Sequence, residues 1–353
     1  MRILITGGAG FVGSHLALFF KREKPGSTVV AFDNLKRRGS ELALRRLASG
    51  GVEFRHGDVR NPEDLAATGS LDLLVECSAE PSAQAGLHGG ELYVVNTNLV
   101  GTINCLEHAR RHDAAVVFLS TSRVYPIADL RALPLVPTET RFVLPAATTG
   151  PGWSARGITE EFPLTGSRSL YGATKLCSEL IIIEYVALYG LRAVINRCGV
   201  LAGPWQMGRV DQGFVVLWAA RHLFGGALSY NGFGGAGLQV RDVLHVDDLY
   251  CLIREQIEHM PIHTGRIYNV GGGANCSVSL KELSEECAQR TGQRLTIMSQ
   301  PETNPVDIPF YVTDNSTVAT ATGWFPRLSL NDILDDVFGW LRKHRGELEP
   351  ILK

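Results

Sequence analysis

The amino-acid sequence predicts an α/β fold: a Rossmann-like doubly wound parallel sheet followed by a smaller C-terminal α/β substrate-binding cap. Short apolar runs alternate with helix-length segments through the first half of the chain, a glycine-rich turn follows the first run, and an acid closes the second. Strands separated by helical crossovers form parallel sheets with helices on both faces. We expect a Rossmann domain over residues 1–196 and mainly the cap over residues 197–353, with some segments returning to the sheet.

The predicted elements follow this alternation in order. The expected strands are the apolar runs Arg2–Thr6, Thr28–Asp33, Val52–His56, Leu71–Cys77, Ala115–Ser120, Arg192–Arg197 and Arg266–Val270. The expected helices are Phe11–Lys21, Leu42–Leu47, Glu91–Arg110, Leu176–Tyr189, Ser279–Thr291 and Leu330–Arg345. Residues 127–168 are rich in Pro, Thr and Gly, so we expect a long functional insert within the Rossmann domain. From Leu201 the pattern is irregular and Gly-rich until the last two helices.

Bulk composition narrows the functional classes. The 353 residues carry a formal net charge of −2, which predicts no general affinity for nucleic acid or anionic membranes. The longest apolar runs are too short for a membrane span, and the chain opens directly on a strand without a signal-peptide pattern. The seven cysteines are odd in number and form no C-x-x-C pair. We therefore expect a cytoplasmic protein with reduced thiols and no metal.

A dinucleotide site is predicted where the first strand becomes a helix. Gly7 permits a tight turn, Gly10 lets the backbone approach a pyrophosphate, and Gly13 lets the helix pack closely on the sheet. The pyrophosphate would lie at the helix N-terminus, where free N–H groups and the helix dipole favour anions. Asp33 ends the next strand, where a carboxylate accepts hydrogen bonds from the adenosine ribose and favours NAD over NADP.

Three features beside this site leave alternatives open. Lys36, Arg37 and Arg38 follow Asp33 and would also suit the 2′-phosphate of NADP. Asp58 can bind the adenine amino group or act as the N-cap of the following helix. Ala79, after the fourth strand, is small enough to let the backbone pass close to the cofactor.

Hydroxyl and amine groups predict the catalytic chemistry. Ser120, Thr121 and Ser122 end an apolar strand, and ligands of open α/β sheets bind beyond the carboxyl ends of strands. Tyr171 and Lys175 are four residues apart at the start of a helix, so they share one face. A free tyrosine has a pKa near ~10, and a neighbouring ammonium group stabilises the phenolate so that it acts as a base nearer neutral pH.

Four segments together resemble the extended short-chain dehydrogenase/reductase superfamily of NAD-dependent epimerases and dehydratases, over nearly the whole chain. They are Thr-Gly-Gly-x-Gly-Phe-x-Gly, Ser-Thr-Ser-x-Val-Tyr, Tyr-x-x-x-Lys and Arg-Asp-Val-Leu-His-Val-Asp-Asp. The resemblance implies that Thr121, Tyr171 and Lys175 are catalytic. It implies NAD contacts from Gly7, Gly10, Phe11, Val12, Asp33, Asn34, Asp58, Val59, Ala79, Asn98, Ser120, Tyr171, Lys175 and Cys198.

Within this superfamily, further residues select a reaction. The 4,6-dehydratases carry Asp-Glu after the catalytic Thr, where this chain has Ser122 and Arg123, and arginine cannot act as a general base. The long insert and the segments 139–141, 157–160, 196–206 and 210–213 resemble the CDP-paratose 2-epimerase branch, although Pro126 stands where most members have Gly. This resemblance implies inversion at C2 of a CDP-hexose through a transient 2-keto intermediate, with NAD regenerated.

The same resemblance implies substrate contacts and assembly. The expected substrate-binding residues are Glu80, Thr121, Ser122, Arg123, Gln206, Asp211, Gln212 and Arg241. Arg241 and Gln206 would anchor the nucleotide, whereas the loop 209–212 either lines the sugar pocket or is a polar loop without ligand. His245, Asp247 and Asp248 suggest helix N-capping rather than a metal. The apolar helices 99–109 and 175–189 imply a homodimer or homotetramer.

Two other functions stay open. A UDP-sugar 4-epimerase would use the same Thr, Tyr and Lys residues. A non-catalytic NAD-binding regulator is the alternative from another class, although such proteins usually lack the Tyr or the Lys. The sequence leaves the sugar and the nucleobase undetermined.

Overall fold

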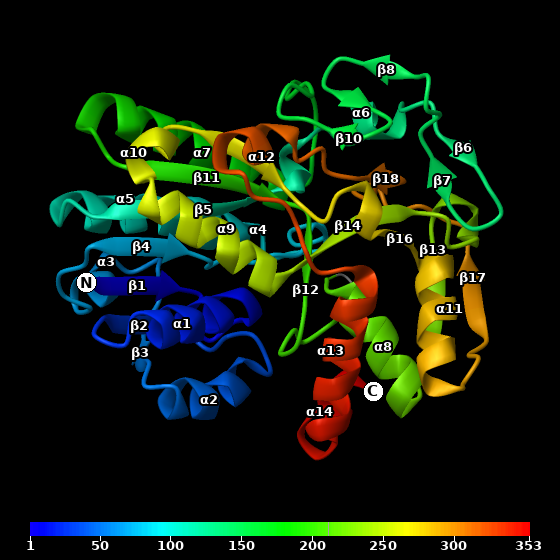
Figure 1. Cartoon of the computed structure of the whole chain (residues 1–353), viewed down its shortest axis with the longest axis horizontal. Coiled ribbons are helices and arrows are strands. Elements are labelled where there is room, and N and C mark those ends of the chain that lie inside the picture. Colours follow the sequence, from blue (N-terminus) through cyan, green and yellow to red (C-terminus); the bar gives the residue numbers. More distant parts are fainter. Residues whose placement is uncertain (211) are drawn as a thin grey trace. The chain divides into compact units, whose positions relative to one another are not determined.

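The protein is described by a computed structural model that covers residues 1–210 and 212–353. Its main element is a seven-stranded sheet in the order β15–β11–β5–β4–β1–β2–β3 (Figure 1). The strands are β1 (Arg2–Thr6), β2 (Thr28–Asp33), β3 (Glu53–His56), β4 (Leu73–Glu76), β5 (Ala115–Thr121), β11 (Ala193–Cys198) and β15 (Ile267–Val270). All seven predicted strands are present, and the expected Rossmann-like fold is confirmed.

The order of the strands reverses beside β1. The chain runs outward from β1 through β2 to β3, then returns to form β4 and β5 on the other side of β1, and these neighbouring strands are parallel. In open α/β sheets, ligands bind at such a reversal, beyond the carboxyl ends of the strands. The topology therefore places the expected ligand site at the ends of β1 and β4.

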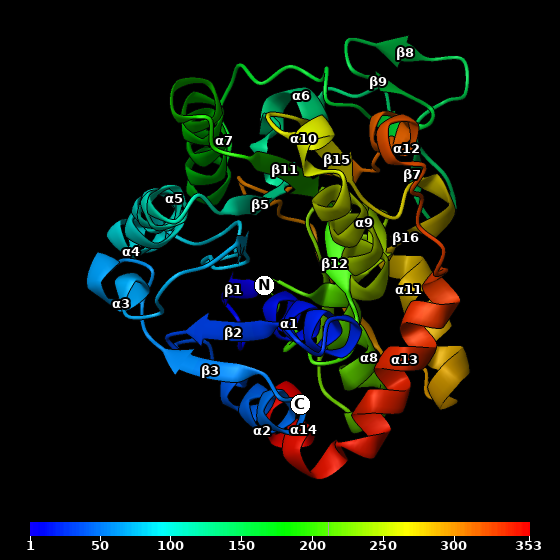
Figure 2. The ribbon, with the colours of Figure 1, turned by 60° about the vertical axis from the view of Figure 1, so that its left-hand side comes forward.

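Helices cover both faces of this sheet (Figure 2). One face carries α3 (Pro62–Ala66), α4 (Glu91–Val95), α5 (Gly101–Arg111) and α7 (Leu170–Tyr189); the other carries α1 (Phe11–Glu23), α2 (Ala43–Ser49) and α9 (Val246–Glu258). On the α5–α7 face, Leu74, Leu106, Phe118 and Ile182 belong to one buried apolar cluster. The expected helix 91–110 is interrupted by a π-helical turn, Asn96–Val100 (η2).

The chain divides into two compact units. Unit 1 comprises Met1–Val124, Leu170–Arg197 and Leu249–Tyr268, and unit 2 comprises Tyr125–Ser169, Cys198–Asp248 and Asn269–Lys353. The insert 127–168, which we expected in the Rossmann domain, therefore lies in unit 2, and the segment 249–268 returns to unit 1. The two units are similar in length.

Unit 2 contains more regular structure than the sequence indicates. Its largest sheet joins β12 (Val200–Ala202), β14 (Val240–His245), β16 (Ser277–Ser279) and β18 (Phe310–Tyr311), and β13 (Leu228–Asn231) pairs with β17 (Ile297–Gln300). Its longer helices are α8 (Phe214–Phe224), α11 (Leu280–Thr291), α13 (Leu330–Lys343) and α14 (Arg345–Leu352), and α12 is Ser316–Thr322. The expectation of an irregular stretch after Leu201 was wrong because α8 is apolar nearly all round, which hides the helical period.

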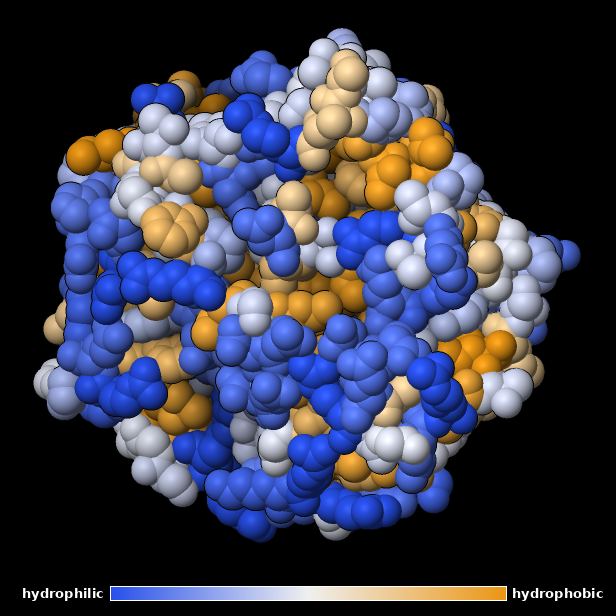
Figure 3. Space-filling model, turned by 45° about the vertical axis from the view of Figure 1, so that its right-hand side comes forward, coloured by the Kyte–Doolittle hydropathy of each residue, from blue (hydrophilic) through white to orange (hydrophobic). Residues whose placement is uncertain are grey.

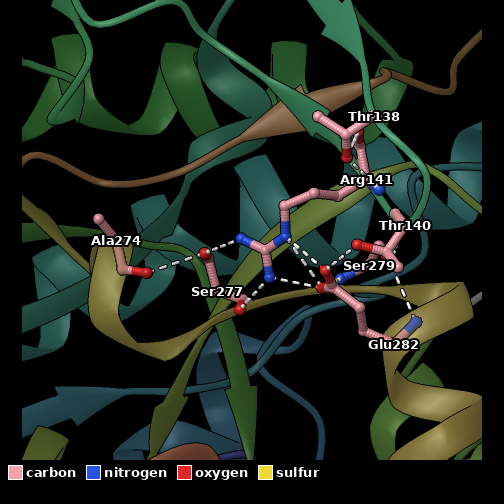
Figure 4. A network of polar contacts seen from close by, with 7 residues as sticks. All are labelled: Thr138, Thr140, Arg141, Ala274, Ser277, Ser279 and Glu282. Carbon is pink, nitrogen blue, oxygen red and sulfur yellow. Dashed lines mark hydrogen bonds and ion pairs between the residues drawn. The ribbon is translucent and has the colours of Figure 1, made fainter.

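The insert forms short elements held by an ion-pair network. These are α6 (Ile127–Arg131), β6 (Val136–Pro137), β7 (Phe142–Val143), β8 (Thr149–Gly150), β9 (Trp153–Ser154) and β10 (Gly157–Ile158). Arg141 donates to Glu282 (Nε–Oε1 2.7 Å) and to the Ser277 hydroxyl (Nη1–Oγ 3.0 Å), and Thr140 donates to Glu282 (2.8 Å) (Figure 4). The Thr140–Arg141 pair therefore fastens the insert to the start of α11.

The residues proposed for helix capping meet that expectation only in part, at His245. His245 Nδ1 accepts from the Asp247 N–H at 3.1 Å, near the start of α9. The Asp248 carboxylate accepts instead from the backbone N–H groups of Arg327 and Leu328 (3.0 and 2.9 Å), so its predicted capping role was wrong. Across 1–210 and 212–353, no three His, Cys, Asp or Glu side chains are grouped to hold a metal ion.

The surface in Figure 3 is mostly hydrophilic, with hydrophobic side chains in separate patches. Scattered apolar side chains are normal on a folded protein. Within the described part of the chain, none of the helices has both the length and the apolar character needed to cross a bilayer.

Candidate active site

The glycine-rich turn between β1 and α1 is sterically constrained. Gly7 has φ +64°, and a Cβ at this position would lie 2.8 Å from the Cys77 carbonyl carbon. A Cβ on Gly13 would lie 2.2 Å from the Gly7 carbonyl oxygen, and one on Gly8 would lie 2.6 Å from the Ala31 Cα. Gly8 was given no role from the sequence, because it falls outside the three-residue spacing of Gly7, Gly10 and Gly13.

Gly10 differs from these glycines. A Cβ there would lie 3.0 Å from the Gly7 carbonyl oxygen, which would have to shift by a few tenths of an ångström, whereas the contacts of a Cβ on Gly8 or Gly13 are shorter. Gly10 is the N-cap of α1, no side chain caps this helix, and no acid lies in its first turn. The N-terminal N–H groups, including those of Phe11 and Val12, therefore suit a pyrophosphate. This cradle fits the phosphates of a dinucleotide.

Asp33 ends β2 and holds the turn in place. Its carboxylate accepts from the N–H groups of Ala9 (3.1 Å) and Leu35 (2.8 Å). Burial raises the pKa of the carboxyl, while the Leu35 and Ala9 hydrogen bonds oppose that rise. A carboxylate fixed at the end of β2 is well placed to accept hydrogen bonds from a ribose diol.

Asp58 and its neighbours form the next part of the predicted cofactor site. Burial raises the pKa of Asp58, but hydrogen bonds from Arg60 and Asn34 outweigh it and lower this pKa to about 2. The N-cap of α3 is Asn61, so the alternative capping role of Asp58 was wrong. Lys36 lies over the Tyr93 ring, with Nζ 3.2 Å from the centroid.

The predicted catalytic residues lie on β5 and α7, which pack against each other within unit 1. Thr121 is the last residue of β5, and its hydroxyl oxygen accepts from the Arg123 N–H at 3.2 Å. Tyr171 and Lys175 lie one turn apart in the first turns of α7, and both are buried. The Lys175 ammonium nitrogen is 4.1 Å from the centroid of the Phe118 ring on β5.

Asn98 fixes the loop after β4 relative to α7. From the π-helical turn, its side chain accepts from the Glu80 N–H (2.7 Å) and donates to the Glu80 carbonyl (3.2 Å) and the Thr174 hydroxyl (3.3 Å). π-Helical turns occur frequently at functional sites. The predicted contact of Asn98 with the cofactor stays a prediction, and its side chain holds Thr174, the residue beside Lys175.

A second polar network lies under the same helix. The Ser120 hydroxyl donates to Glu179, and Arg197 donates to both carboxylate oxygens of Glu179, with the shortest contact at 2.8 Å. All three side chains are buried. Ser120 was predicted to contact NAD, and its hydroxyl is engaged in this internal network.

The remaining predicted contacts are placed as follows. Ala79 and Glu80 lie in the loop after β4, buried Val59 follows β3, and Ser122 and Arg123 form a 3₁₀ turn after Thr121. In unit 2, Cys198 ends β11, the Gln206 side chain donates to the Leu201 carbonyl (2.9 Å), and Gln212 forms a backbone bridge to Arg209. Asp211 lies outside the described residues. Their roles toward ligands stay predictions.

Arg241 is the predicted diphosphate anchor and lies on β14. Its Nη2 donates to the Asp307 carboxylate at 3.0 Å and to the Ile308 carbonyl at 2.6 Å. The guanidinium is thus fixed in one orientation within unit 2. Its contact with a diphosphate stays a prediction.

The parallel sheet, the glycine turn and the acid at the end of β2 define a dinucleotide-binding fold. The chain belongs to the NAD dependent epimerase/dehydratase family, whose profile matches residues 3–271. Membership of this family confirms the predicted superfamily and NAD as the cofactor. The protein is therefore an NAD-dependent enzyme of the epimerase/dehydratase type.

Individual relatives share most of their length with this chain. A CDP-paratose 2-epimerase from Salmonella typhi is 30% identical over 96% of this chain and 99% of its own. A dTDP-glucose 4,6-dehydratase from Mycolicibacterium smegmatis is 28% identical over 99% and 96%. The crystal structure of a double mutant of a Streptomyces venezuelae dTDP-glucose 4,6-dehydratase, with NAD bound, superposes with a TM-score of 0.79 at 27% identity over the full length of both chains.

Proposed function

We propose that this protein is a nucleotide-sugar epimerase that inverts C2 of a CDP-hexose. The observation that carries the proposal is the placement of Thr121, Tyr171 and Lys175 at the adjoining ends of β5 and α7 in a family of NAD-dependent enzymes. The similarity to a CDP-paratose 2-epimerase supports the choice of sugar nucleotide and position.

The proposed reaction begins at the C2 hydroxyl of the sugar. Thr121 hydrogen-bonds this hydroxyl, and Tyr171 as phenolate removes its proton. When bound beside these residues, NAD would supply the hydride acceptor, and in its reduced form the hydride donor, for C2. Lys175 stabilises the phenolate and holds the nicotinamide ribose. The planar 2-keto sugar then rotates in the site so that its opposite face receives the hydride. Tyr171 returns the proton to the oxygen, which leaves the enzyme unchanged at the end of the cycle.

Arg123 supports epimerisation over dehydration. It follows Thr121 by two positions, in the 3₁₀ turn where the acid and base of a dehydratase would be expected. A guanidinium has no accessible neutral form in a protein, so it cannot remove a proton from carbon. We infer that this protein shares the fold and the hydride step with its dehydratase relatives. It does not share their elimination of water.

A UDP-sugar 4-epimerase is the second candidate. A UDP-glucose 4-epimerase from Halalkalibacterium halodurans is 27% identical over 98% of this chain and 96% of its own, and it supports this reading. The two functions differ in the nucleobase and in the carbon that is inverted. A panel of CDP- and UDP-sugars separates them directly.

Assembly into a homodimer or homotetramer is part of the proposal. Leu180, Leu188 and Tyr189 on α7 are exposed by 62, 68 and 56%, which is high for large apolar side chains. Exposed apolar helix faces are typical of subunit contacts. A location in the cytoplasm stays a prediction from the sequence.

The catalytic role of Tyr171 is tested by Tyr171→Phe, with Tyr185→Phe on the same helix as the matched control. Removing the general base should lower kcat about 10²- to 10⁴-fold in a protein that still folds and binds NAD. The Tyr185 hydroxyl donates to Glu107, away from the proposed reaction, so its loss should leave kcat within about twofold. Full epimerase activity in a folded, NAD-bound Tyr171→Phe protein would refute the mechanism.

A further inference from the structure

A carboxylate is buried in the sheet beneath the predicted catalytic lysine. In register, Glu76 on β4 lies between Thr6 on β1 and Phe118 on β5. Its side chain is completely buried. One carboxylate oxygen accepts from the Thr102 hydroxyl of α5 at 2.6 Å, and the other, Oε2, has no hydrogen-bond partner among the described residues.

Lys175 reaches the same layer from α7. Its ammonium nitrogen lies 4.1 Å above the ring of Phe118, the register neighbour of Glu76, and its side chain is only 2% exposed. The positive charge of Lys175 lowers the pKa of Glu76, against the larger effect of burial. The carboxylate and the ammonium group therefore interact within a region from which water is excluded.

We infer that Glu76 is a positioning residue: it is the buried counter-ion that keeps Lys175 protonated. An ammonium group removed from water loses its proton at lower pH unless a negative charge compensates it. Lys175 must stay charged to stabilise the Tyr171 phenolate, so Glu76 would act on the reaction through Lys175. This inference rests on the proposed function only for its effect on turnover.

Other titratable groups in the layer do not replace Glu76 in this role. Burial raises the pKa of the Cys105 thiol on α5 well above its usual range, so this group is neutral. Glu179 lies one turn after Lys175 on α7, but Arg197 and Ser120 already compensate its charge. Glu76 accepts a hydrogen bond from the Thr102 hydroxyl. Among the described residues, Lys175 is the cation that lowers its pKa.

The arrangement is unfavourable for packing alone, which indicates a functional reason for the acid. A buried carboxylate with an unsatisfied oxygen destabilises the fold, whereas a leucine or glutamine would carry no such charge. Strongly perturbed ionisable groups gather at functional sites. The position of Glu76 at the end of β4 and beside the last residue of β1, within unit 1, agrees with this interpretation.

The inference is tested by titrating Lys175 itself, which requires no substrate. The protein has seven lysines, so an NMR titration with ¹³C at the lysine Cε resolves few signals, and Lys175→Met assigns the relevant one. In Glu76→Gln we expect the pKa of Lys175 to fall by about one unit or more. The alkaline limit of kcat should move down in pH by the same amount.

Two further variants control the experiment. Asp72→Asn removes a surface carboxylate just before β4 and should leave the Lys175 titration unchanged. Glu76→Asp retains the carboxylate at a greater distance and should give an intermediate shift, so it serves as the test if Glu76→Gln does not fold. An unchanged Lys175 titration in a folded Glu76 variant would overturn the inference, whereas an altered titration without epimerase activity would count against the proposed function alone.

Discussion

At the scale of single residues, the candidate site relies on charged groups held inside the protein. Lys175 is almost completely buried and Glu76 is fully buried, while the Asp33 carboxylate at the end of β2 accepts from two backbone N–H groups, which oppose the rise of its pKa caused by burial. The same burial that isolates these groups from water strengthens their mutual interactions. The ionised Glu76 is therefore expected to support catalysis and to lower the stability of the fold.

Replacement of Glu76 by Gln should stabilise the folded protein near neutral pH. Burial raises the pKa of Glu76 from 4.5 to about 6 despite the opposing effects of Lys175 and Thr102, so its ionised form is disfavoured in the folded state. The wild-type protein therefore loses up to ~2 kcal/mol of folding stability as the pH rises from the Glu76 pKa of the unfolded chain through that of the folded protein. Urea unfolding of both proteins at pH 4 and pH 7 measures the difference, which should appear at pH 7 and vanish at pH 4.

The residues of the Rossmann turn and the Tyr171–Lys175 pair were predictable because their spacing along the chain is local. The relation between Glu76 and Lys175 was not predictable from spacing. It depends on the register of β4 against β5 and on the placement of α7 over both strands. The available signal was an acid at the end of the apolar run Leu73–Glu76, which is unusual for a strand buried on both faces.

At the scale of elements, the turn into α1 separates two roles of glycine. Gly10→Ala should lose less stability than Gly13→Ala, since its Cβ would lie 3.0 Å from the Gly7 carbonyl oxygen, and it should weaken NAD binding, because its methyl group would occupy the approach of the pyrophosphate. Gly13→Ala should destabilise the protein by about 1–3 kcal/mol, because its Cβ would lie 2.2 Å from the Gly7 carbonyl. Thermal unfolding and NAD titration of both variants distinguish these effects, and equal loss of stability in both would contradict the assignment.

The insert 127–168 is held to the rest of unit 2 by contacts between residues far apart in the sequence. The sequence indicated a functional insert, and the structure shows that Arg141 fastens it to Ser277 and Glu282 at the start of α11 (Figure 4). Segments so distant in sequence cannot be paired from one chain alone.

Arg141→Ala should therefore destabilise unit 2 by about 1–3 kcal/mol, because it leaves the half-buried Glu282 without its ion pair. Arg294→Ala is the matched control, since Arg294 is 78% exposed and its ion pair with Glu285, itself 42% exposed, should contribute less than about 1 kcal/mol. Denaturant unfolding of the two variants checks the difference. Similar stabilities for both would show that the Arg141 network does not hold the insert.

At the scale of the whole molecule, the parallel sheet was predicted because its buried strands are short apolar runs between helices. Unit 2 was predicted less well, since its strands are short and pair across long stretches of sequence, as β14 does with β18. Its apolar helix α8 lacks the amphipathic period on which the prediction depended.

Self-association is the prediction that belongs to this scale. Leu188→Glu replaces a large apolar side chain on the exposed side of α7 by a charged one and should convert the proposed oligomer to a monomer, because burying an unpaired carboxylate is unfavourable. Light scattering of both proteins at the same concentration measures the change. A wild-type protein that is already monomeric would contradict the proposed assembly.

The central claim is most directly tested by incubating the NAD-bound protein with a panel of CDP- and UDP-hexoses and following the products by NMR. The proposed function predicts a CDP-hexose inverted at C2, with no net consumption of NAD and no loss of water. Inversion at C4 of a UDP-sugar would instead establish the second candidate, and a 4-keto-6-deoxy product would contradict the exclusion of dehydratase chemistry.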